Sequence, residues 1–127
     1  MPAEIVVLVV AESASASEIF ARTMQLTGRG KVLGDRSAGA VRESRSYVHT
    51  VGSQTAAFYG ASVTIADLVM PDDGRLENVG VTPDEMVLPT GADLRDRRDP
   101  PLARALALLG AAVTPEHAGR LTWEMDK

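Results

Sequence analysis

The stretch Glu12-Ser-Ala-Ser-Ala-Ser-Glu18 joins an apolar run, residues 4–10, to a segment with the apolar spacing of a helix, residues 19–24. We call residues 12–18 the serine turn. A turn from a strand into a helix aims free backbone N–H groups and the positive end of the helix dipole at one point. A nucleophilic hydroxyl and a developing oxyanion would be stabilised there. The chain is therefore expected to be organised around this turn.

The residues on either side of the serine turn predict half of a βαβ unit. Residues 4–10 consist of Glu4 and a continuous Val/Ile/Leu run, which is typical of a central parallel strand covered on both faces. The helix is expected to end near Thr27, because Gly28 suits the positive φ that follows many helices. A second strand at Lys31–Gly34 would return parallel to the first. The predicted fold class is therefore α/β with parallel central strands.

The rest of the chain predicts a loop, a β-hairpin region and a C-terminal helix. Polar and small residues make 35–46 a loop with a bend at Gly39, which we expect to face the serine turn at the carboxyl edge of the sheet. Gly60 is expected to be a kink or bulge. Strands are expected at about 45–51, 55–59, 61–70 and, after a short strand and a turn within 76–84, at 86–88.

The C-terminal quarter carries clear helix signals. Asp99 can cap a helix whose first turn holds two prolines and whose end is marked by Gly110. A second cap signal follows at Thr114-Pro-Glu116. We expect residues 1–127 to form one domain, with a peripheral tail at 111–127.

Composition excludes several classes of function. The net charge is −4 and acids and bases are interspersed, so no basic stripe suited to nucleic acid is expected. The absence of cysteine excludes disulfides, thiolate metal sites and a cysteine nucleophile. No segment approaches the roughly 20 apolar residues of a membrane span. The N-terminal run carries Glu4 and no preceding Lys or Arg, which argues against a signal peptide and leaves the compartment open.

Neither a metal nor a cofactor is expected. Two histidines far apart, without a patterned carboxylate, do not make a metal site. The glycines do not form a phosphate-binding loop. Any chemistry must therefore come from side chains, and the serines are the first candidates.

Ser15 has a purely structural alternative. With Glu18 three residues further on, it satisfies the spacing of a capping box, in which the two side chains bond the free amides of the first helical turn. A serine that caps a helix needs no second function. Spacing alone leaves both the cap and the nucleophile open.

Longer motifs point to a family. The run Ser13-Ala-Ser-Ala-Ser-Glu-Ile-Phe-Ala21, followed by Gly28-Arg-x-x-Val-x-Gly34, resembles the nucleophile segment of the C-terminal processing (tail-specific) serine proteases. The similarity extends through 32–39, 62–66, 70–74 and 77–84. It implies a crotonase/ClpP-like α/β fold in which Ser15 attacks the peptide carbonyl and the amide of Ala16 is one oxyanion donor, as helix-start geometry also suggests.

The lysine general base of those proteases has no counterpart here. At the positions of the family's lysine and glutamine, 25 and 29 residues after the nucleophile, the chain has Ala40 and Ser44, and neither can act as a base near neutral pH. The sequence instead resembles the branch that includes the tricorn core protease, where a histidine activates the serine and a glutamate assists. Glu77 matches that glutamate, with a solvated turn carboxylate as the alternative.

In that branch the histidine, and a glycine-rich strand that completes the oxyanion hole, lie upstream of the residues present here. The chain therefore resembles the C-terminal half of a protease core, and it would have little activity alone. Its own His49, on a predicted strand, and His117, near a cap, are weak candidates for a base.

The resemblance implies a serine-type endopeptidase that cleaves unstructured or C-terminal polypeptide segments, in a parent protein that would be periplasmic or exported. The alternative, favoured by Ala40, is a catalytically inactive protease-like binding or structural module. We also expect a homo-oligomer, because a first strand that is apolar throughout would leave a sheet edge or face uncovered.

Overall fold

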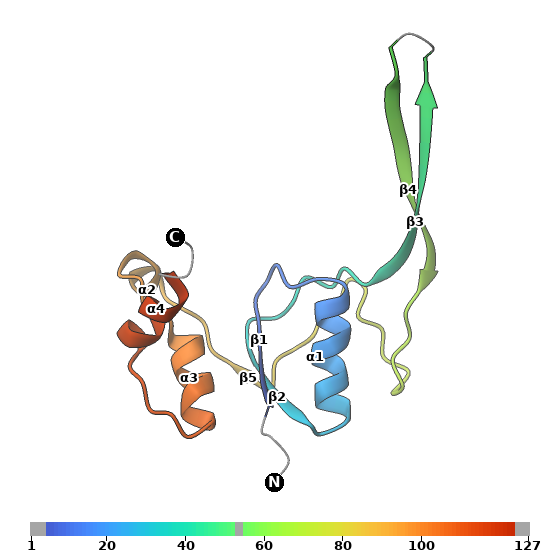
Figure 1. The fold of residues 1–127 in the computed structure, drawn as a ribbon. Coiled ribbons are helices and arrows are strands. Elements are labelled where there is room, and N and C mark those ends of the chain that lie inside the picture. Colours follow the sequence, from blue (N-terminus) through green and yellow to red (C-terminus); the bar gives the residue numbers. More distant parts are fainter. Residues whose placement is uncertain (1–4, 53–54, 124–127) are drawn as a thin grey trace.

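The computed structural model describes residues 5–52 and 55–123. Its centre is a parallel sheet in the order β1-β2-β5, formed by β1 (Ile5–Val9), β2 (Gly30–Gly34) and β5 (Glu85–Met86). Helix α1 (Ala16–Leu26) lies on one side of the sheet and α3 (Pro100–Leu108) on the other (Figure 1). The predicted α/β class, with parallel strands and a helix after the first strand, is confirmed.

The core lies between α1, the sheet and the loops that follow β2. Its buried apolar members are Val9, Ala21, Val32, Val41, Met70, Leu76 and Val81. Helix α1 ends where the sequence predicts, because Thr27 is its last cap residue and Gly28 follows with a φ of 61°.

The central strand is β2 and not β1, which corrects the expectation for residues 4–10. Val32 and Leu33 are completely buried, whereas Ile5 and Leu8 of β1 are 40% and 41% exposed. Within the described residues β1 pairs only with β2. An apolar run indicates that a strand can be buried, but it does not specify which strands lie beside it.

The β-hairpin extends away from the body of the molecule. It is formed by β3 (Arg42–Val51) and β4 (Ala57–Asp67), which are antiparallel, exposed along their lengths, and project beyond α1 (Figure 1). One strand replaces the two predicted at 55–59 and 61–70. Gly60 is not a bulge: a Cβ there would lie 2.8 Å from the Tyr47 carbonyl oxygen, so the glycine permits close approach of the strands.

Residues 76–84 form no strand, contrary to expectation, and β5 is only two residues long. Asp84 replaces part of the strand pairing: its carboxylate accepts from the Val32 N–H at 2.7 Å and its own N–H donates to the Val32 carbonyl at 2.8 Å. A side chain that mimics a strand partner is invisible to patterns of hydrophobicity.

Three helices complete the chain. The short helix α2 (Gly91–Arg95), capped by Thr90, was not predicted. Helix α3 begins as expected, because Asp99 accepts from the Leu102 N–H at 2.9 Å. Helix α4 (Pro115–Trp123) packs on α3, with Ala118 fully buried and the Thr122 hydroxyl donating to Asp99 at 2.8 Å.

The carboxylate of Glu85 is held by two cationic side chains, Lys31 and Arg104. This arrangement leads to a first prediction. Hydrogen bonds from Arg104 and then Lys31 lower the pKa of Glu85 from 4.5 to about 2. A carboxylate whose pKa is lower when folded contributes stability above its unfolded pKa, and that stability is lost as the pH falls between the two values. The urea midpoint of the chain should therefore fall from pH 5 to pH 2.5 by more than that of Glu85→Gln. If the urea midpoints of the unmutated chain and of Glu85→Gln fall equally with pH, these exposed ion pairs contribute nothing to stability.

Candidate active site

The serine turn lies at the carboxyl end of β1, at the edge of the sheet where ligands bind in open α/β folds. The chain reverses within a few residues. The Ser13 N–H donates to the Val10 carbonyl at 2.9 Å, and the Ser13 hydroxyl accepts from the Val10 N–H at 3.0 Å. These two bonds fold residues 10–13 into a sharp turn that brings the chain to the start of α1.

Ser15 has a strained backbone. Its φ of 58° and ψ of −124° fall in a region that side chains other than glycine rarely adopt and that costs about 1–3 kcal/mol. Two acceptors hold its N–H, the Ala40 carbonyl and a carboxylate oxygen of Glu18, both at 3.0 Å. A serine on a sharp strand-to-helix turn of this kind presents its hydroxyl outward, as nucleophile turns do.

The three serines of the turn differ in what their hydroxyls do. The Ser13 hydroxyl bonds within the turn, and the Ser17 hydroxyl donates to the Ala14 carbonyl at 2.7 Å. Ser15 and Glu18 occupy the positions of a capping box, but α1 has no side-chain cap hydrogen bond from the Ser15 hydroxyl. Ser15 is also exposed. Its hydroxyl is thus the one best placed to react.

Ala16, the predicted oxyanion donor, is the first residue of α1. The first amides of a helix have no acceptor within the helix. The Ala16 N–H therefore lies beside the Ser15 hydroxyl at the positive end of the helix dipole, where it can donate to a developing negative charge.

Glu18 is a buried carboxylate at the centre of the site. Its side chain is 0% exposed and accepts four hydrogen bonds. One oxygen accepts from the Ser37 hydroxyl at 2.5 Å and the Gly39 N–H at 2.7 Å. The other accepts from the N–H groups of Ser15 and Ala40, each at 3.0 Å. Glu18 thus joins the serine turn to residues 37–40, a role that the capping spacing did not reveal.

Glu77 lies at the same end of the sheet as the serine turn. Its carboxylate accepts from the Val41 N–H at 2.8 Å and pairs with Arg42 at 3.0 Å. Val41 directly follows Ala40, whose carbonyl holds the Ser15 N–H. Because the Glu77 side chain is only 17% exposed and its oxygens are engaged, it is more than a solvated turn acid.

Residues 37–41 and 77–81 are joined to each other by hydrogen bonds, and we call this pair of segments the clasp. The clasp fixes the distance between Ser15 and Glu77. The Asn78 N–H donates to the Gly39 carbonyl at 2.7 Å, and the Val81 N–H donates to the Ser37 hydroxyl at 2.6 Å. Gly39 and Gly80 have φ values of 71° and 72° and lie against the facing backbone. The chain bends at Asp35 and not at Gly39 as predicted. The loop that carries Gly39 does face the serine turn, because the Ala38 N–H donates to the Ser13 carbonyl at 2.9 Å and the Ser15 N–H to the Ala40 carbonyl.

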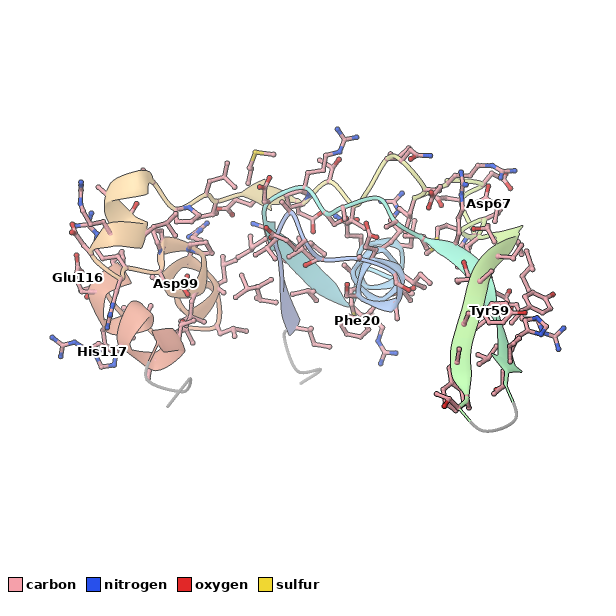
Figure 2. All side chains as sticks on the ribbon, turned by 90° about the horizontal axis from the view of Figure 1, so that it is seen from above. Phe20, Tyr59, Asp67, Asp99, Glu116 and His117 are labelled. Atoms are coloured by element: carbon pink, nitrogen blue, oxygen red, sulfur yellow. The ribbon has the colours of Figure 1, made fainter. Side chains whose placement is uncertain are left out.

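Neither histidine reaches the serine turn. His49 lies on β3, stacked on Tyr59 with ring centroids 5.5 Å apart, and is seven residues, or roughly 23 Å of extended chain, beyond Arg42. His117 lies on α4, on the far side of the sheet from Phe20 of α1 (Figure 2). Both remain unsuited to act as the base for Ser15.

Within residues 5–52 and 55–123, no cluster of three metal-binding side chains occurs. Over the same ranges, no helix is long and apolar enough to cross a membrane.

Comparison with solved structures gives the same fold in several proteins. The chain is similar to mature CPAF, solved in complex with lactacystin, with 25% identity and a TM-score of 0.59 over 72% of the chain. It is 26% identical to a candidate peptidase from Parabacteroides merdae, with a TM-score of 0.63 over 84% of the chain. The tricorn protease shares the fold, at 23% identity, with a TM-score of 0.65 over 84% of the chain.

The chain spans only part of these proteins: 17% of CPAF, 31% of the Parabacteroides protein and 10% of the tricorn protease. The sequence of residues 1–87, which includes the serine turn, Glu18 and Glu77, matches the profile of peptidase family S41. Because the matched stretch covers more than half of the residues, the chain belongs to peptidase family S41.

Proposed function

We propose that this chain carries the nucleophile side of a serine peptidase site, with Ser15 as nucleophile and the Ala16 N–H as oxyanion donor. The observation that carries the proposal is the strained, exposed Ser15 at the start of α1, whose hydroxyl makes no cap hydrogen bond. Strain of this kind persists only where the surrounding structure holds it, and it is concentrated at functional sites.

In this proposal the Ser15 oxygen attacks the carbonyl carbon of a peptide bond. Its proton passes to a base, and the carbonyl oxygen becomes an oxyanion held by the Ala16 N–H. The base then protonates the leaving amine, and water hydrolyses the acyl-enzyme. Family membership supports a polypeptide substrate, and we propose unstructured or C-terminal segments as the part that is cleaved.

The base is proposed to be a histidine from a region outside these 127 residues, as in a Ser-His-Glu arrangement. Ala40 occupies the position of a lysine base, and His49 and His117 are both remote from Ser15. The small share of the solved structures that the chain spans is consistent with a role as the C-terminal half of a catalytic core.

A second candidate is a catalytically inactive module that keeps the fold. Its argument is Ala40 at the position of the lysine base, whereas the match to a peptidase family does not favour it. In that case Ser15 would have the reactivity of an ordinary alcohol. The test is labelling with a fluorophosphonate, followed by peptide mapping, in the longest natural polypeptide that contains the chain. Labelling at Ser15 supports the peptidase; a folded protein that never labels supports the inactive module, and labelling at Ser13 or Ser17 would refute the site.

Glu77 is proposed to orient the histidine. Glu77→Gln is expected to lower kcat of the longest natural polypeptide by about 10²- to 10⁴-fold. The neutral amide would no longer orient the imidazole of the histidine or stabilise its positive charge. The matched control is Arg42→Gln, which removes the ion-pair partner of Glu77 and leaves its carboxylate. Equal activity in Glu77→Gln and the unmutated protein, measured with a fluorogenic peptide, would leave Glu77 a structural acid.

Self-association is also proposed. Among the described residues, β1 pairs with a strand on one edge only. Its other edge and the exposed apolar residues of the hairpin, including Val48 and Phe58 at 72% and 75% exposure, are surfaces that tend to pair. The 127-residue chain is expected to elute as a dimer or larger species, measured by light scattering over a concentration series. A monomer at the highest concentration would contradict this expectation.

A further inference from the structure

Glu18 makes no contact that peptide hydrolysis itself requires, yet it is the most completely bonded carboxylate of the site. It bonds the backbone of the nucleophile directly, through the Ser15 N–H at 3.0 Å. It also bonds the Ala40 N–H at 3.0 Å, and Ala40 in turn holds the Ser15 N–H through its carbonyl. Glu18, Ala40 and Ser15 therefore form a closed set of three contacts.

From this arrangement, and resting on the proposed function, we propose that Glu18 is a positioning residue that holds Ser15 in its reactive conformation. The angle φ couples the direction of the Ser15 N–H to that of its Cα–Cβ bond, so a group that holds the N–H also sets where the side chain leaves the backbone. Glu18 supplies an inward acceptor. Glu18 is the third residue of α1, so its carboxylate also lies beside the free amides at the start of the helix.

The second oxygen of Glu18 links the nucleophile to Glu77. It accepts from the Ser37 hydroxyl and the Gly39 N–H, and Ser37 and Gly39 bond the segment that carries Glu77, through Val81 and Asn78. The Glu18 carboxylate thus holds Ser15 through one oxygen and, through the other, the residues that bond the segment carrying Glu77. A shift of about 1 Å in such a frame can cost about 10²-fold in rate.

The direct test is Glu18→Gln, which keeps the size of the side chain but turns an N–H donor toward the Ser15 or Gly39 side of the cluster. We expect the rate of fluorophosphonate labelling at Ser15, measured in the longest natural polypeptide, to fall by about 10- to 10³-fold. With a peptide substrate, kcat should fall while KM changes little, because Glu18 does not touch substrate. The control is Glu12→Gln, an exposed carboxylate of the same turn.

A second readout needs no catalysis and uses the 127-residue chain. Amide hydrogen exchange at Ser15 should be slow in the unmutated chain and at least 10-fold faster in Glu18→Gln, whereas core amides such as that of Val32 should exchange as before. A merely structural role would accelerate exchange everywhere or nowhere.

If Glu18→Gln does not fold, Ser37→Ala decides. It removes one donor to Glu18 and the acceptor of the Val81 N–H, and it does not touch Ser15. A folded variant in which labelling at Ser15 is slowed at least 5-fold and the Ser15 amide exchanges faster supports the proposal. The proposal is overturned if folded Glu18→Gln labels and exchanges as the unmutated protein does. If Glu18→Gln does not fold, the same result with folded Ser37→Ala overturns it. If the unmutated protein never labels, the proposed function fails instead, and faster exchange at Ser15 would still show that Glu18 holds the turn.

Discussion

Ser15→Gly is expected to stabilise the 127-residue chain and, in the longest natural polypeptide that contains it, to remove labelling by a fluorophosphonate. Glycine adopts a φ of 58° without the strain that serine bears there. Release of that strain is worth about 1–3 kcal/mol, and the added freedom of glycine in the unfolded chain offsets about 0.5–1 kcal/mol. The free energy of unfolding in urea should therefore rise by about 0–2 kcal/mol.

Ser15→Ala is the matched variant, because it removes the hydroxyl and keeps the strain. Since the hydroxyl makes no side-chain cap bond to α1, we expect the stability to change by less than about 0.5 kcal/mol, below the usual cost of losing a cap. In the longest natural polypeptide both variants should lose peptidase activity by about 10⁴- to 10⁶-fold.

Two results would contradict this account of Ser15. A loss of more than about 1 kcal/mol in Ser15→Ala would show that the serine caps the helix after all. Peptidase activity retained in both variants would show that the nucleophile lies elsewhere.

Gly80→Ala is expected to destabilise the chain by about 2–5 kcal/mol. A Cβ at Gly80 would lie 2.4 Å from the Ser37 carbonyl oxygen, at a φ of 72°. The left-handed conformation costs an alanine about 1–2 kcal/mol, and the displacement of packed backbone adds about 1–3 kcal/mol. Because Ser37 bonds Glu18, the damage should reach the serine turn.

The matched control is Gly28→Ala. Gly28 has a similar φ of 61°, but a Cβ there would meet nothing within 4 Å, so only the cost of the left-handed conformation, about 1–2 kcal/mol, applies. Urea unfolding of both variants separates the two effects. Equal losses in the two variants would mean that residues 37–41 move aside freely, and that the clasp does not fix the site.

Local patterns in the sequence are sufficient to specify the structure around Ser15. An apolar run, a serine turn and a helix that ends before Gly28 specify a strand, a sharp turn and a helix, because each is set by interactions between residues close in the chain. A local signal also identifies Asp99 as the cap of α3. Motif similarity makes Ser15, Ala16 and Glu77 candidates without reference to geometry.

How these elements meet depends on long-range packing, which local patterns do not contain. The order β1-β2-β5 makes β2 the central strand, and Asp84 stands in for a strand partner that periodicity had predicted. Glu18 has the spacing of a capping residue, yet its carboxylate accepts from Ser37, Gly39 and Ala40, which lie 19 to 22 positions away. Residue spacing indicates which side chains are neighbours along one helix. Burial and hydrogen bonding between loops depend on the packing of the whole chain, which no local pattern contains.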